Sequence, residues 1–227
     1  MNINNYLNLS ESAMSIVEPF TSPNTFKIYF KAVKHGEIDS IIRHHIVNNI
    51  AFAFKEHPVI YEQTIQYIAD KLKISPLQIK IIGSAKTGFC MDPKHYGRNF
   101  NNNSDIDLSI ISDTTFKTLE KELNLWNHDF RQMQIKATND RENRFWKDNS
   151  ERVPKNLAKG YIDSSKIPNR PQYSFTCELN NILYVTHRHL VNKHNIKTQK
   201  VTASIYRDWH SFFNRLKNNV SYCMQSL

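Results

Sequence analysis

Two short groups of residues in this chain have the types and spacing needed for chemistry on phosphates. Gly83 and Ser84 follow a β-branched run, and Asp105 and Asp107 lie two positions apart further along the chain. A glycine at the end of a strand lets the backbone turn sharply and brings its N–H groups close to a ligand. Side chains two apart on a strand leave the same face, so the two carboxylates are expected to point together.

Phosphoryl transfer from a nucleoside triphosphate would use both sets of residues. The triphosphate is strongly negative and needs N–H and hydroxyl donors, usually at a turn that leads into a helix. The reaction depends on positioning and on charge neutralisation by a divalent metal, for which clustered carboxylates are the hard oxygen ligands. Two adjacent carboxylates otherwise cost stability, so the pair indicates a metal. In the purely structural alternative, the aspartates form a solvated strand edge and Gly83-Ser84 a simple turn.

A small sheet must position these residues. The β-branched run 78–82 ends at Gly83, residues 105–111 alternate polar and apolar in their first half, and residues 200–206 form a third plausible strand. The stretch 89–103 contains Pro93, Gly97 and four asparagines, and is expected to be an exposed loop.

The spacing of apolar residues predicts that much of the remaining chain is helical. Residues 1–30 are expected to form a loose arm with a short helix around 12–17, and 136–172 an irregular charged segment with a short helix near 140–147. Longer helices are expected over about 37–55, 58–73, 114–133, 173–195 and 208–222.

Composition places these elements in one domain spanning 1–227, with an N-terminal helical region over about 1–75 and C-terminal helices over about 173–227. The hydrophobic content of 40% suffices for an ordinary core. The formal net charge of +9 favours a polyanionic partner such as a nucleotide or nucleic acid, although it would also serve solubility alone.

The cysteines and the apolar runs indicate in which cellular compartment the protein is expected. Three widely separated cysteines form neither a disulfide framework nor a paired metal motif, which is typical of a reducing cytoplasm. No leader and no run of about 20 apolar residues is visible, so no membrane association is expected. The histidines lack the accompanying Glu or Cys of zinc motifs.

The two groups together resemble the signature of the DNA polymerase beta-like nucleotidyltransferase superfamily. That signature is an apolar strand, Gly-Ser, a helix start and then Asp-x-Asp on the next strand, here over roughly 79–112, about a seventh of the chain. The similarity implies an α/β (α+β) fold with a small mixed sheet and flanking and appended helices. Stand-alone bacterial nucleotidyltransferases, some of them in toxin or antiphage defence modules, are the members it resembles most.

The resemblance also implies roles for residues. Asp105 and Asp107 would bind Mg²⁺ (or Mn²⁺) and act in catalysis. The backbone at Gly83, the Ser84 hydroxyl and the turn up to Gly88 would hold the phosphates of a nucleoside triphosphate such as ATP, with Lys86 adding positive charge. The reaction implied is nucleotidyl transfer to an acceptor hydroxyl of RNA, DNA, a protein, a second nucleotide or a small molecule.

Two departures from the pattern bear on activity. The loop 89–103 makes the gap between the two groups long, which a surface insertion tolerates. Catalytic members also have a third carboxylate on a later strand, and no later segment shows a clear one. Asp208 is favoured because it follows the strand-like residues 201–206, with a helix cap as its structural alternative. Glu178 and Asp163 are the other candidates.

The missing acid supports an alternative from a different class. A degenerate nucleotidyltransferase fold would sense a nucleotide or bind nucleic acid without catalysis. A basic tract over 131–159 would fit contacts to nucleic-acid phosphates, or equally a solvated face.

Overall fold

The computed structural model describes residues 7–227; residues 1–6 of the predicted arm lie outside the described part. Its longer helices are α3 (Pro23–Ala32), α5 (Pro58–Leu72), α7 (Asp113–Arg131), α8 (Asp140–Ala158), α9 (Ser174–His194) and α10 (Trp209–Gln225). The short ones are α2 (Glu11–Met14), α4 (Ile38–Ile42), η2 (Arg43–Val47), α6 (Ser84–Thr87) and single 3₁₀ turns η1 (His35–Glu37), η3 (Phe52–Phe54), η4 (Pro76–Gln78), η5 (Pro93–His95) and η6 (Ser164–Lys166).

One mixed sheet of four strands lies at the centre, in the order β1-β2-β4-β3. The strands are β1 (Ile79–Ile82), β2 (Ile106–Ile111), β3 (Tyr161–Asp163) and β4 (Val201–Tyr206). β2 and β4 are parallel, whereas β1 and β3 pair antiparallel at the two edges. The predicted α/β (α+β) class with a small mixed sheet is confirmed.

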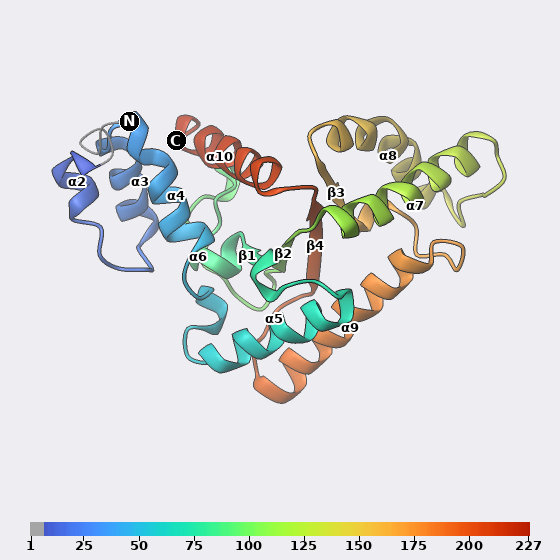
Figure 1. Cartoon of the computed structure of the whole chain (residues 1–227), viewed down its shortest axis with the longest axis horizontal. Helices are drawn as coiled ribbons and strands as arrows, with labels where there is room; N and C mark the ends of the chain where they lie inside the picture. The colour runs from blue at the N-terminus through green and yellow to red at the C-terminus, as the bar shows by residue number, and fades with distance from the viewer. Residues whose placement is uncertain (1–6) are drawn as a thin grey trace.

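Alternation along the strands gives the sheet one apolar face. On β2, Ile106, Leu108 and Ile110 are all almost fully buried and pack with apolar residues of α5, α7 and α9. These helices therefore cover one side of the sheet, with α8 beyond α7 (Figure 1). Burial of apolar surface on this side is the main stabilising contribution to the fold.

The opposite face is polar at one end and apolar at the other. Ile111 and Tyr206, at the ends of β2 and β4, pack with Phe212 of α10 and Phe26 of α3 in a second core cluster. α10 and the N-terminal helices thus lie on this side (Figure 1). Among residues 7–227, no helix is both long and apolar enough to cross a bilayer.

The structure departs from the sequence predictions at several places, one of them β3, which lies inside the predicted irregular segment 136–172. The predicted helix 37–55 is interrupted after η2, where Asn48 is extended and Asn49 has a positive φ of 66°. α3 occupies part of the predicted loose arm, and α8 continues to Ala158 through Pro154 instead of ending near 147. The remaining predicted helices and strands are present, with ends shifted by a few residues.

Gly88 closes α6 in a conformation that only glycine adopts easily. Its φ is +88°, and a Cβ there would lie 2.9 Å from the ring of Phe52. We expect Gly88→Ala to lower the free energy of unfolding by about 1–3 kcal/mol, from the backbone strain alone. Urea denaturation would measure this loss.

Gly36 provides the matched control, because a Cβ at this position meets nothing within 4 Å. Gly36→Ala should leave the urea midpoint unchanged or slightly raised. Equal midpoints for the two variants would contradict the assigned role of Gly88.

Candidate functional site

The start of β2 carries the two aspartates of the predicted metal pair. The N–H of Ile106 donates to the carbonyl of Lys200 (2.9 Å), and in the register of the parallel strands Asp107 stands opposite Thr202. Asp105 lies one residue before β2. The backbone pairing with β4 therefore fixes where both carboxylates emerge, on the face away from Leu108.

Asp105 has an unsatisfied oxygen. Its Oδ1 is buried without a hydrogen-bond partner in the described part of the chain, while Oδ2 lies 3.4 Å from the ammonium of Lys200. A buried carboxylate oxygen without a partner is costly unless a cation or a donor faces it. The pair with Lys200, whose side chain is 59% exposed, compensates only part of that cost.

Asp107 is more enclosed and has one strong partner. The hydroxyl of Thr202 donates to its Oδ1 at 2.6 Å. Burial raises the pKa of Asp107; the bond from Thr202 opposes this shift, and the negative charge of Asp105 adds to it. A cation beside both carboxylates would favour their charged forms and so oppose the rise in the pKa of Asp107.

The Gly83-Ser84 turn lies directly against this pair. Gly83 has a φ of +68°, and a Cβ there would be 3.0 Å from Oδ2 of Asp107. The absent side chain thus lets the backbone approach the carboxylate closely. Ser84 begins the single-turn helix α6 and lines the same cavity as both aspartates.

Lys86 does not reach the site. It is buried, and its ammonium donates to the carbonyls of Asn48, Asn49 (2.7 Å) and Ile50 (3.2 Å). Burial lowers its pKa to about 8. The predicted role in holding phosphates is therefore wrong for Lys86, because all its donors serve the segment that follows η2. Gly88 likewise packs on Phe52 at the end of α6, away from the carboxylates.

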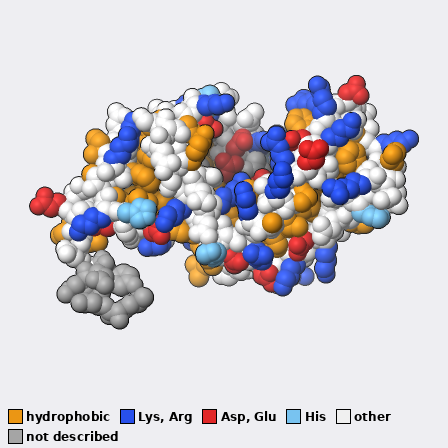
Figure 2. Space-filling model, turned by 90° about the horizontal axis from the view of Figure 1, so that it is seen from above, with side chains coloured by type: hydrophobic (Ala, Val, Ile, Leu, Met, Phe, Trp, Pro, Cys, Tyr) orange, Lys and Arg blue, Asp and Glu red, His pale blue; other side chains and the backbone are white. Residues whose placement is uncertain are grey.

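Two cavities adjoin the pair. The larger, about 660 Å³, is lined by Gly83, Ser84 and both aspartates together with residues of loop 89–103 and of α10. The smaller, about 340 Å³, lies over β3 and β4 and shares Asp107 with the larger one. Figure 2 shows a central hollow with acidic side chains inside it and Lys and Arg side chains around it.

Asp163 is the third acid that the fold brings to this region. It lies on β3 opposite Ser204 of β4, and both line the smaller cavity. Its Oδ1 accepts from the Ser204 hydroxyl and lies 3.5 Å from the guanidinium of Arg215, which in turn stacks 3.7 Å from the ring of Tyr161. Asp163 thus belongs to an ion pair next to the aspartate pair, and its charge adds to the causes that raise the pKa of Asp107.

The other two candidates for a third carboxylate lie elsewhere. β4 runs away from Thr202 at about 3.3 Å per residue, so Asp208 lies at the opposite end of the sheet. There it caps α10, its Oδ1 accepting from the N–H of Ser211 at 2.7 Å. The expected catalytic position of Asp208 is therefore wrong. Glu178 is exposed on α9, which covers the apolar face.

The donor set of the pair fits one kind of metal. Among the described residues no three His, Cys, Asp or Glu side chains are grouped for metal binding, so the site offers two carboxylates. The partnerless oxygen of Asp105 and the raised pKa of Asp107 both suit a hard divalent cation completed by substrate phosphates and water, as Mg²⁺ prefers.

The burial of Asp107 predicts how the stability of the protein depends on pH. Because its folded pKa is raised, the native state keeps this proton while the unfolded chain loses it, so stability falls as pH rises above the ordinary value of 3.8. Asp107→Asn keeps the acceptor for Thr202 and removes the charge. Without divalent metal at pH 7, this variant should unfold at the same urea concentration as wild type or a higher one.

The advantage of Asp107→Asn should shrink as the pH falls toward 3.8. Added Mg²⁺ should stabilise the wild type only, since a ligand of the native state adds to its stability. A variant that is clearly less stable than wild type at pH 7 would show that the charge is compensated within the protein.

The position of Asp208 makes a second prediction. Asp208→Ala should cost about 0.5–2 kcal/mol of stability, because α10 loses its N-cap. Its affinity for magnesium nucleotide, measured by calorimetry, should equal that of wild type. A selective loss of nucleotide affinity would return Asp208 to the site.

Comparison of the chain with protein-family models, with curated proteins and with solved structures gave no match. The functional argument therefore depends on the residues of the site themselves. These are two carboxylates on adjacent positions of one strand face, a glycine turn in contact with one of them, and two cavities that meet there.

Proposed function

We propose that this chain is a metal-dependent nucleotidyltransferase that moves a nucleotidyl group from a nucleoside triphosphate to an acceptor hydroxyl. The observation that carries the proposal is the partnerless buried oxygen of Asp105 beside the raised-pKa carboxylate of Asp107. Both residues line a cavity of about 660 Å³ that also contains the Gly83-Ser84 turn, a volume typical of small-molecule sites.

The larger cavity accommodates the triphosphate. Ser84 supplies a hydroxyl, and Arg98 of loop 89–103 is the basic side chain that lines the same space. Asp105 and Asp107 would hold the magnesium, whose charge neutralises the phosphate oxygens. The net charge of +9 draws in such a substrate from solution.

The smaller cavity suits the acceptor, because it meets the larger one at Asp107. The acceptor oxygen would bond to the α-phosphorus, pyrophosphate would leave, and the hydroxyl proton would pass to a carboxylate. Asp107 and Asp163 are the carboxylates that line this cavity. Hydroxyls of Thr202 and Ser204 lie between them on β4 and can orient a polar acceptor.

A second candidate function rests on a specific observation. The strand position opposite Asp107 holds Thr202, and Asp163 is neutralised by Arg215. Thr202 is not a carboxylate and Asp163 is already paired with Arg215, so a free carboxylate base is lacking among the described residues there. This favours a protein that binds magnesium nucleotide without transferring it. Both functions require the same nucleotide site and differ only in turnover.

Calorimetric titration of each magnesium nucleoside triphosphate tests the shared requirement. We expect the wild type to bind. The affinity of Asp105→Asn/Asp107→Asn should be lower by at least about tenfold, or 1.4 kcal/mol. Asp148→Asn is the matched control, since Asp148 forms an exposed ion pair with Arg152 on α8. Failure of the wild type to bind any of the nucleotides with Mg²⁺ would refute both candidates.

Transfer separates the two candidates. With α-labelled nucleotide and RNA, DNA, protein and small hydroxyl compounds as acceptors, an enzyme releases pyrophosphate and labels one acceptor class. Asp163→Asn should lower the rate of transfer and leave nucleotide affinity intact if the smaller cavity receives the acceptor. Tight nucleotide binding without labelling of any of these acceptors would favour the binding protein.

A further inference from the structure

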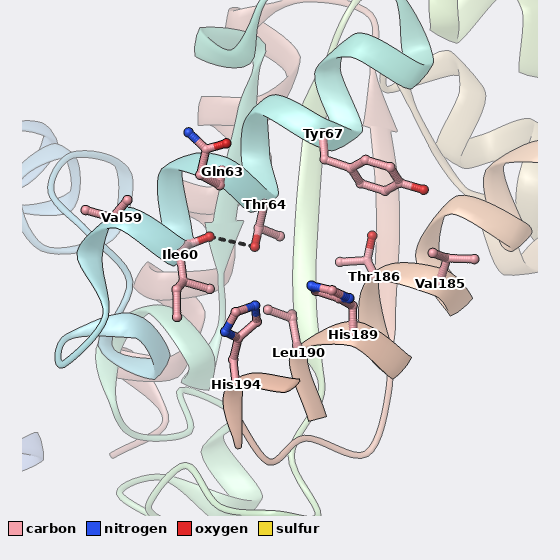
Figure 3. A pocket seen from close by; sticks show the side chains of 10 residues that line it. All are labelled: Val59, Ile60, Gln63, Thr64, Tyr67, Val185, Thr186, His189, Leu190 and His194. Carbon is pink, nitrogen blue, oxygen red and sulfur yellow. Dashed lines mark hydrogen bonds between the residues drawn. The ribbon is translucent and has the colours of Figure 1, made fainter. Parts of the chain in front are cut away.

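A third cavity lies on the other side of the sheet, between α5 and α9. Its volume is about 450 Å³, and none of its lining residues belongs to the two cavities at the aspartate pair. Figure 3 shows side chains of both helices converging on it, with Val59 and Ile60 of α5 toward one end and Tyr67 toward the other.

The walls of this cavity are apolar even where the residues are polar. The hydroxyl of Thr64 donates to the carbonyl of Ile60 (2.7 Å), and that of Thr186 to the carbonyl of Ile182 (2.8 Å). Each hydroxyl is satisfied within its own helix, so neither demands a partner in the cavity. Together with Leu190, the two threonines leave the cavity lined almost entirely by carbon.

Two histidines provide the polar end. His189 and His194 project from α9 toward α5 with ring centroids 5.1 Å apart (Figure 3). Among residues 7–227, no aspartate or glutamate lines the cavity, and none occurs between Glu178 and Asp208 in the sequence. Lys193 in the last turn of α9 adds a positive charge near the histidines.

We propose that this cavity binds an amphiphile with an apolar body and an anionic head such as a carboxylate. The apolar body would occupy the space between Thr64, Thr186 and Leu190, and the head would face His189 and His194. An apolar cavity of about 150 Å³ holds one benzene, so 450 Å³ accepts a body of medium-chain fatty-acid size. The charge of Lys193 and the lack of acids in the lining complement the anionic head and disfavour an amine.

The test uses decanoate as the probe, with 1-decanol and decylammonium as matched compounds, in calorimetric titrations of the full chain below their aggregation limits. Decanoate should bind one per chain and more tightly than both matched compounds. Thr64→Phe, which fills the cavity, should weaken decanoate binding by roughly tenfold or more. His189→Gln/His194→Gln should abolish the preference for decanoate over 1-decanol.

Controls separate the cavity from general surface effects. Thr118 on α7 has the same hydroxyl bond to the preceding turn but is exposed, so Thr118→Phe should bind as wild type does. His128→Gln is the corresponding control for the histidines. If Thr64→Phe does not fold, Val59→Trp narrows the opening from a side chain that is 70% exposed.

Three results would overturn the proposal. These are absence of saturable decanoate binding, equal affinity in the cavity-filling variant and wild type, and equal affinity for decanoate and decylammonium. Because magnesium-nucleotide binding is measured at a separate site, failure of this proposal leaves the proposed function untouched.

Discussion

The structure depends on how two carboxylates are held at the beginning of β2. Asp105 and Asp107 lie on one strand face, so their mutual repulsion cannot be relieved by rotation of the backbone. Two contacts from β4 and its preceding residue reduce the repulsion. The hydroxyl of Thr202 donates to Asp107, and the ammonium of Lys200 pairs with Asp105. The repulsion is therefore tolerable only where the parallel pair β2–β4 is formed.

The apolar side of the sheet provides the energy that maintains this arrangement. Leu108 follows Asp107 and is almost fully buried among residues of α5, α7 and α9. α9 is anchored to α7 by Glu122, whose carboxylate accepts from the N–H groups of Phe175 and Thr176 (2.7 and 2.8 Å). Desolvated charge on one face is thus offset by apolar burial on the other.

Alternation and spacing in the sequence predicted the parts of the site that are local. The strands ending at Gly83 and containing Asp107 are short, regular runs flanked by turn residues, so their type and their facing side chains could be predicted. β3 was not predicted, because three residues after a long helix show no periodicity. The proximity of Asp163 to the site therefore had no local signal.

Other errors have tertiary causes. Lys86 looks like a phosphate ligand in the sequence, and only the path of residues 48–50 explains why its ammonium is used internally. The same contact explains the interruption of the predicted helix 37–55, since those carbonyls turn toward Lys86 rather than along a helix axis. The sequence correctly predicted that Asp208 follows a strand. Because that strand, β4, runs parallel to β2, Asp208 lies at the end of the sheet opposite Asp105 and Asp107.

The hydrogen bond between Thr202 and Asp107 spans 95 positions in the sequence, and this separation has a consequence for folding during synthesis. Parallel pairs joined through long crossovers form late, because chain entropy is lost before contacts compensate it. While a ribosome still holds β4, the sheet lacks its second central strand and both carboxylates lack their partners. The nascent chain therefore cannot assemble the aspartate site until β4, about a hundred residues after β2, has emerged.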